Sequence, residues 1–184
     1  RYTMKTTKAS SAHYVANQTE IDFENADKKK MTVTFNVSAN DIAFRYSFPQ
    51  QGDTRVMVIT GEATSFSFPQ QTTTFLCPQN KAMSAWMHTK PCYEEEYKLD
   101  MPMSERSLYG EGYTFPCLFR IGSDGWALVS ETGTDGKYVG CHLSDYVPET
   151  GYTIAFPMPG ESNGIGQTSA GVALPCNTPW RTIT

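Results

Sequence analysis

The stretch "MTVTFNVSANDIAFRYSF", residues 31–48, decides the fold because apolar and polar residues alternate through two runs. The first run, 31–40, sets methionine, valine and phenylalanine on one face against threonine, asparagine and serine on the other. The second run, 42–48, alternates in the same way and turns Arg45 to the polar side. A period of two residues is that of a β-strand, and Asn40-Asp41 supplies turn residues. The stretch therefore predicts an antiparallel hairpin with one wet face.

The same pattern recurs along most of the chain. Turn residues such as "GSDG" (122–125) separate the runs, and no segment has the periodicity of a long helix. No repeat of fixed period occurs, which disfavours a propeller or a solenoid. These features predict an all-β protein, an antiparallel β-sandwich. The further strands are expected at 55–60, 65–69, 72–76, 113–121, 126–131, 137–143, 151–157 and 171–175.

One region breaks the pattern. Residues 77–108 are rich in methionine, proline and charge, and they predict a long irregular excursion with one helical turn near 94–97. The length of 184 residues fits one domain, so we expect a single β-sandwich over 1–184 that carries this excursion. The chain starts at Arg1 without an apolar signal region, and "PWRTIT" at its other end reads as a strand beginning. We therefore expect it to be a fragment of a longer protein.

Composition excludes some classes of partner. The net charge is −4 and the pI is near 5.4, so no basic face is expected to bind nucleic acid. No run approaches the ~20 apolar residues of a membrane span. The five cysteines have no zinc-ligand spacing. Buried free thiols are the first interpretation of them, and one or two disulfides are the alternative.

Motifs for self-contained catalysis are missing. The pair Gly110 and Gly112 lacks the third glycine and the helix of a dinucleotide site, and the three histidines have no partner motif. The cluster "YEEEY" (93–97) suits a solvated turn better than a cation site. One carboxylate raises a sharper question, because Glu131 ends the predicted strand 126–131 just before a glycine-rich turn. It is either a solvated strand-end acid or a ligand that points out of the sandwich.

Six segments, in order, resemble the N-terminal domain of glycoside hydrolase family 97. They are "DIAFRYSFP" (41–49), "SAWMHTKPCYEEEY" (84–97), "GYTFPCLFRIGSDGWALVSETG" (112–133), "KYVGCHLSD" (137–145), "YTIAFP" (152–157) and "TPWRTI" (178–183). Together they extend over nearly the whole chain. No segment is decisive alone, but the series in register is fairly specific. The resemblance implies a β-super-sandwich of the galactose-mutarotase type that lacks its first strands before Arg1.

The resemblance also carries expectations about function. Enzymes of this family are bacterial, common in Bacteroidetes, and act as α-glucosidases or α-galactosidases. They join the sandwich to a catalytic (β/α)₈ barrel of the same polypeptide, and secreted members work in the periplasm with calcium. Glu131 in "SETG" matches the glutamate that the N-terminal domain supplies as a calcium ligand. No catalytic residue is expected in this chain, which alone should be inactive on its oligosaccharide substrate.

Two other functions remain open at this stage. A free-standing carbohydrate-binding module would stack sugar rings on Trp86, Tyr93 and Tyr97. An enzyme that resembles a sugar epimerase would need a histidine and a carboxylate that face each other in a concave sheet. Glucoside or galactoside specificity, and inverting or retaining chemistry, depend on residues of the barrel.

Overall fold

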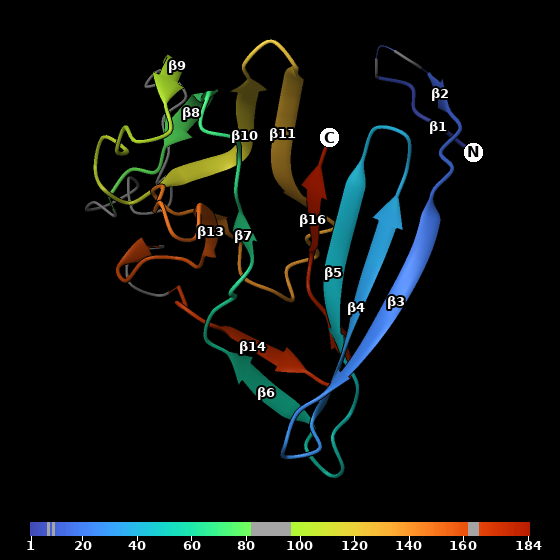
Figure 1. Cartoon of the computed structure of the whole chain (residues 1–184). Helices are drawn as coiled ribbons and strands as arrows, with labels where there is room; N and C mark the ends of the chain where they lie inside the picture. Colours follow the sequence, from blue (N-terminus) through green and yellow to red (C-terminus); the bar gives the residue numbers. More distant parts are fainter. Residues whose placement is uncertain (7, 9, 82–96, 162–165) are drawn as a thin grey trace.

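The protein is built from strands. The computed structural model describes residues 1–184 apart from 7, 9, 82–96 and 162–165, and this part contains no α-helix (Figure 1). All the strand pairings are antiparallel, so the predicted all-β class is confirmed. The strands are β1 (Tyr2–Thr3), β2 (Ser11–Ala12), β3 (Asn17–Glu24), β4 (Lys30–Val37), β5 (Ile42–Phe48), β6 (Val56–Ile59), β7 (Ser65–Phe66), β8 (Thr72–Pro78), β9 (Lys98–Pro102), β10 (Tyr113–Ile121), β11 (Gly125–Thr132), β12 (His142–Leu143), β13 (Tyr152–Ala155), β14 (Ala170–Ala173), β15 (Cys176–Asn177) and β16 (Trp180–Ile183).

Most of these strands form one curled sheet. Its order is β3-β4-β5-β16-β11-β10-β12-β13-β7, with β8 added beside β10, β9 beside β8, and β15 beside β5. Strand β10 belongs to both parts of the curl, because Tyr113 pairs with β12 while 117–121 pair with β11. A register shift against β8 lies between these two halves, and such a bulge bends a strand. The sheet therefore turns at β10, and β12, β13 and β7 pack over the face of the first strands.

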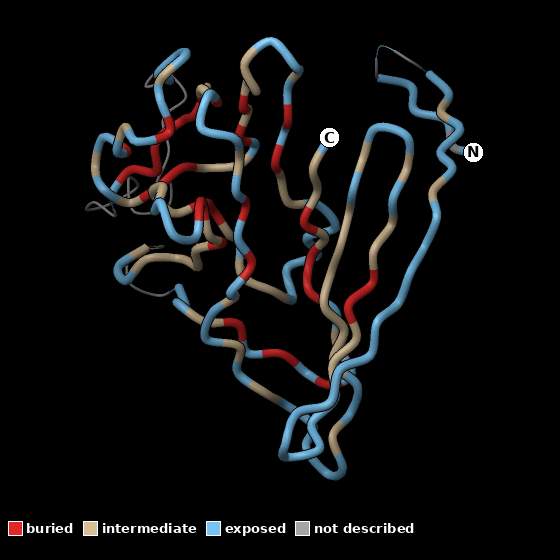
Figure 2. The backbone as a smooth tube through the Cα atoms, viewed as in Figure 1, coloured by how far each residue is buried: buried red, intermediate tan, exposed pale blue. Residues whose placement is uncertain are grey.

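The core lies between these two layers (Figure 2). Phe119 of β10 and Tyr152 of β13 are almost fully buried, with ring centroids 5.2 Å apart. Phe66 of β7 reaches across to Phe44 of β5, at 6.5 Å between centroids. Such aromatic contacts add to the burial of apolar area that stabilises the sandwich. A separate ribbon, β6 paired with β14, closes the lower end in Figure 1.

The hairpin predicted over residues 31–48 forms as expected. Strand β5 matches the expected 42–48, and β4 pairs with it so that Val33 faces Tyr46 and Phe35 faces Phe44. The opposite face is less wet than expected, because Thr34 is buried at 5% exposure. The cation–π contact of Arg45 with the ring of Trp180 lies on this opposite face, at 4.4 Å from the ring centroid.

Several segments differ from the prediction, among them the short strands β1, β2 and β15, which were not expected. The excursion 77–108 contains β9, which pairs with β8, while its expected helical turn falls almost entirely within 82–96, outside the described residues. The expected strand at 137–143 is reduced to β12 because Cys141 donates its N–H to a side chain instead of a neighbouring strand. Strand β3 was missed, although its apolar residues alternate in "NQTEIDFE".

The first interpretation of the cysteines, buried free thiols, holds in part. Cys117 is a buried free thiol, Cys141 and Cys176 are free thiols that are only partly buried, Cys77 is buried, and Cys92 lies in the undescribed segment. Burial raises the pKa of the Cys117 thiol well above its ordinary value, so this thiol stays protonated and unreactive at neutral pH. No helix in the part of the chain that the structure covers is long and apolar enough to cross a membrane.

Candidate functional site

Glu131 lies in a buried ion-pair cluster. Strand β11 turns Ala127, Val129 and Glu131 to the inner layer, and its register sets Glu131 directly opposite Arg181 of β16. An Nη1 N–H of Arg181 donates to Oε2 of Glu131. The other side of the guanidinium donates to Glu62, from Nε at 3.0 Å and from Nη2 at 2.6 Å. Arg181 therefore bridges two carboxylates, one of them in bidentate geometry.

The cluster carries surplus negative charge. The side chains of Arg181, Glu62 and Glu131 are 0%, 6% and 8% exposed, so water screens them little. Burial acts to lower the pKa of Arg181, but the hydrogen bonds and charge of Glu62, with the charge of Glu131, outweigh it and raise that pKa. With the guanidinium charged, two carboxylates face one cation. Ionised, the cluster has a net charge of −1.

Neighbouring polar groups extend this cluster. Thr64 donates its hydroxyl to Oε1 of Glu62 at 2.7 Å and shares a 2.7 Å hydrogen bond with the hydroxyl of Tyr46. The backbone N–H of Cys141 donates to Oε1 of Glu131 at 3.3 Å, and its thiol receives an N–H of Arg181 at 3.4 Å. Burial raises the pKa of Cys141 to about 12, so the thiol stays neutral. Two hydrogen bonds thus hold the Glu131 carboxylate, one from Arg181 to Oε2 and one from the N–H of Cys141 to Oε1.

A groove opens on the far side of Glu131. Its volume is about 420 Å³, and Glu131 is the member of the ion-pair cluster that lines it; Glu62 does not. His142 and Glu161 line it as well, so one histidine and two carboxylates border one space. Oε1 of Glu161 is already engaged by the N–H of Met158 at 2.8 Å. The remaining lining residues are Gln79, Thr114, Phe115, Ser130, Thr134, Gly140, Cys141 and Pro157.

His142 is a buried neutral side chain at ordinary pH. It is 5% exposed, and burial lowers its pKa below 6.5, against a smaller opposing effect of a hydrogen bond to the backbone of Glu111. The unfolded chain therefore takes up the proton at a higher pH than the folded chain does. Stability from this residue is complete above pH 6.5 and falls as the pH drops from 6.5 toward the folded pKa.

We expect replacement of His142 by glutamine to flatten the pH dependence of stability. Wild type should lose stability between pH 7 and pH 5 through this group, because its pKa is lowered in the folded chain, and the variant should lose less. Urea unfolding followed by circular dichroism at both pH values measures the difference. Replacement of His13 by glutamine is the control, because the side chain of this histidine is exposed. Equal slopes for wild type and the His142 variant would contradict the assignment.

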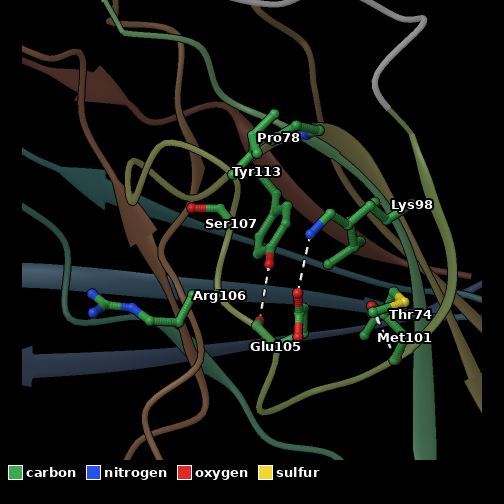
Figure 3. Close-up of a pocket in the computed structure, with 10 residues that line it drawn as sticks. Thr74, Pro78, Lys98, Met101, Glu105, Arg106, Ser107 and Tyr113 are labelled. Atoms are coloured by element: carbon green, nitrogen blue, oxygen red, sulfur yellow. Dashed lines mark hydrogen bonds and ion pairs between the residues drawn. The ribbon is translucent and has the colours of Figure 1, made fainter.

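A second, much smaller cavity has a structural role (Figure 3). Its volume is about 10 Å³, which is space for roughly one water molecule. The hydroxyl of Tyr113 donates to the carbonyl of Glu105 at 3.2 Å, and Lys98 pairs with the Glu105 carboxylate at 3.0 Å. These bonds tie β9 and the following loop to β10. The cavity is too small for a sugar.

The structure describes Glu131 and Tyr97 among the predicted site residues. Glu131 is not a solvated strand-end acid, because its side chain is buried and forms an ion pair with Arg181. The sequence did not predict this ion pair. Trp86, Tyr93 and the acidic run 94–96 lie outside the described residues, and Tyr97 is 43% exposed. Among the described residues no group of three or more histidines, cysteines and acids is placed to hold a metal.

Sequence reasoning missed Arg181 and Glu62. A signal for Arg181 was present in "PWRTI", because period-two alternation sets Arg181 on the same inner face as Ile183. A charged residue on an apolar face is seldom left without a buried partner. Glu62 had no such signal, since it lies in a loop before β7 and is 119 residues from Arg181.

Comparisons with known proteins agree with this fold. The family model described as Glycosyl-hydrolase 97 N-terminal matches residues 1–184. The crystal structure of a β-arabinopyranosidase is 56% identical, with a TM-score of 0.93, and the match covers 100% of this chain and 29% of that chain. A glycoside hydrolase family 97 enzyme from Pseudoalteromonas sp. strain K8, solved with panose and with acarbose, is 21% identical. That match covers 90% of this chain and 22% of that chain, with a TM-score of 0.61, and shows a shared fold.

No curated protein sequence matches the chain significantly. The chain spans 29% and 22% of the length of the two enzymes above. The family match extends over every residue and so includes the six segments from which the resemblance was first drawn. The chain belongs to the N-terminal domain family of glycoside hydrolase family 97.

Proposed function

We propose that the chain is the non-catalytic N-terminal part of a bacterial glycoside hydrolase. In this proposal it packs on a catalytic (β/α)₈ barrel of the same polypeptide and borders the substrate cleft. Family membership and the 29% share of the β-arabinopyranosidase chain support it. Burial also keeps the Cys117 and Cys141 thiols protonated, so neither is an activated nucleophile. The chain alone is expected to be inactive.

Within this function, we infer that Glu131 is a calcium ligand. The contact of two buried carboxylates with one guanidinium is the observation that carries this inference. One carboxylate would neutralise Arg181, so the second serves stability poorly. Oε1 of Glu131 receives only the 3.3 Å bond from Cys141 and borders the groove, so it retains acceptor capacity. Calcium takes six to eight oxygen ligands, so the others must come from outside the described residues. Bound calcium would offset the surplus charge and join the two domains.

The matched pair Glu131→Gln and Glu62→Gln tests the ligand role in the full-length enzyme. Both changes remove one carboxylate partner of Arg181, but only Glu131 borders the groove. We expect Glu131→Gln to weaken calcium affinity roughly tenfold or more, and Glu62→Gln to leave it within about threefold. Isothermal titration calorimetry of the chelator-treated enzyme measures both. Equal calcium affinities for the two variants and wild type would remove Glu131 from the calcium site.

For the substrate, we propose β-arabinopyranosides ahead of the α-galactosides and α-glucosides that the resemblance suggested. The 56% identity to a β-arabinopyranosidase over the whole chain supports this order. Hydrolysis of an aryl β-arabinopyranoside, an aryl α-galactoside and an aryl α-glucoside by the full-length enzyme distinguishes these three substrate classes. Secretion to the periplasm is part of the same proposal, and cell fractionation checks it.

A second candidate function has one observation in its favour. His142 and Glu131 border the same groove, as an enzyme that resembles a sugar epimerase would require. The pairing of Glu131 with Arg181 weighs against it, since a general base must take up a proton, and a proton on Glu131 would disrupt its ion pair with Arg181. Mutarotation of galactose or arabinose, followed by polarimetry with the chain, decides the point. Catalysed mutarotation would favour this second function over the first.

A further inference from the structure

A wide cavity lies on the face of the sheet that points away from Glu131. Its volume is about 730 Å³, within the range of small-molecule sites. Arg45 of β5 and Trp180 of β16 line this cavity. Successive residues of a strand point to opposite faces, so both are turned away from the inner layer that holds Arg181. No lining residue is shared with the groove of Glu131, so the two spaces are separate.

The guanidinium of Arg45 has no anionic partner among the described residues. It takes part in none of their ion pairs, and its Nε is buried without a hydrogen-bond acceptor. Glu20 belongs to the same cross-strand row through Thr34, but it is two strands away, about 10 Å between backbones. Arg45 therefore keeps a charge and N–H donors that the described chain does not satisfy.

The same guanidinium is nevertheless held in place. It lies over the ring of Trp180, 4.4 Å from the centroid, and this ring is itself fixed at its edge by Gly133. A Cβ on Gly133 would lie only 3.3 Å from Cδ1 of Trp180, and φ there is +74°. A guanidinium stacked on a ring keeps the N–H groups in its own plane, where they can bind an oxyanion through two parallel hydrogen bonds. Arg45 is thus a prepositioned donor.

The remaining polar lining suits hydroxyl groups. Asp135 and Lys137, both exposed, pair with each other at 3.4 Å, and β15 adds the exposed amide of Asn177. The charges of Asp135 and Lys137 offset each other, so the net charge of the lining is that of Arg45, in a chain of net charge −4. Carboxylate and amide groups accept and donate the hydrogen bonds that sugar hydroxyls need. The cavity therefore matches a ligand with several hydroxyls and one anionic group.

We propose that this cavity binds an acidic sugar, with Arg45 as the residue that binds its carboxylate or sulfate group. Trp180 holds the guanidinium in position, and Asp135 and Asn177 bind hydroxyls. The proposal takes from the proposed function only that the protein works on carbohydrates, and it does not depend on the calcium role of Glu131. The site is a binding site apart from the groove, and no bond is made or broken there.

Calorimetric titration of the full-length enzyme at constant ionic strength tests this site. The probes are glucuronic acid and galactose 6-sulfate, with glucose and galactose as their neutral counterparts. We expect at least one acidic probe to bind saturably and roughly tenfold or more tightly than its counterpart, because hydrogen bonds between charged groups are the stronger ones. The acidic probe that binds more tightly identifies the anionic group as carboxylate or sulfate.

Three arginine variants assign the binding to this cavity. Arg45→Gln removes the charge and should weaken acidic-sugar binding roughly tenfold or more, whereas Arg120→Gln removes the same charge elsewhere and should leave it within about twofold. Arg45→Lys keeps the charge without the planar fork, and should weaken binding roughly threefold or more. Because lysine retains the charge over Trp180, this variant provides the test if Arg45→Gln does not fold. Unchanged binding in the Arg45 variants would overturn the proposal.

Two other results would also overturn the proposal. The first is the lack of saturable binding by both acidic probes. The second is that lack together with a fall in Tm of roughly 5 °C or more for Arg45→Gln and not for Arg120→Gln, which would assign Arg45 to a carboxylate in the rest of the polypeptide. Hydrolysis of neutral aryl glycosides by the wild-type enzyme is a separate measurement. The proposed function and this site can therefore fail independently.

Discussion

Replacement of Arg181 by methionine should lower the free energy of unfolding by about 3–5 kcal/mol, the usual cost of removing one partner from a buried ion pair. The side chain is fully buried, and its loss leaves the carboxylates of Glu62 and Glu131 facing each other without a cation. Methionine fills a similar volume, so the charge effect dominates the packing effect. Urea unfolding of the chain, followed by circular dichroism, measures the change.

Two controls isolate the charge. Arg120→Met removes a surface pair with Asp100, 2.5 Å apart and 39% and 45% exposed, and should cost at most about 1 kcal/mol. Adding Glu62→Gln and Glu131→Gln to Arg181→Met removes the unpaired charges and should restore a large part of the lost stability. If Arg181→Met unfolded no more easily than Arg120→Met, the cluster would not be a buried ion-pair network.

The single changes Glu62→Gln and Glu131→Gln clarify why the cluster has two acids. Each variant leaves Arg181 with one carboxylate partner, so no buried charge remains unpaired. Each should therefore change stability far less than Arg181→Met. The fold therefore has little need of the second carboxylate. In the proposed function, the second carboxylate serves as a calcium ligand and not as a stabiliser of the fold.

The fold was readable from the sequence wherever local pattern and tertiary position agree. Strand β5 and strand β10 match their predicted bounds because alternation and turn residues mark both ends. Strand β3 was missed because its polar row, and its place beside charged turns, made it resemble a surface loop. The expected strand at 137–143 failed for a tertiary reason, since Glu131 competes for the backbone N–H of Cys141.

The sequence predicted only one residue of the ion-pair cluster. The strand pattern and the family resemblance both singled out Glu131, but not the direction in which it points. Its partner Arg181 is 50 residues away and Glu62 is 119 residues from Arg181, so only the closed sheet brings them together. Period-two alternation could have flagged Arg181 as a buried cation. No local rule identifies which acids pair with it.

Gly112→Ala should be the second severe substitution, with a loss of about 3 kcal/mol or more in the free energy of unfolding. A Cβ at this position would lie 2.0 Å from the carbonyl oxygen of Leu143, and φ is +85°. The backbone has no freedom to retreat, because Gly112 accepts from the N–H of Gln79 at 2.8 Å and donates to Ser107 at 2.9 Å. The clash is with backbone atoms of β12, which adjoins the groove.

Gly110 is the matched control in the same loop. Its φ of +73° imposes a similar conformational penalty, but a Cβ there would meet no atom within 4 Å. Gly110→Ala should therefore cost only about 1–2 kcal/mol, and the difference between the two variants measures the steric term alone. Thermal and urea unfolding of both variants provide the comparison. Equal losses would mean that the loop moves away from β12 at little cost, and that the close approach of Gly112 does not fix the position of His142 at the groove wall.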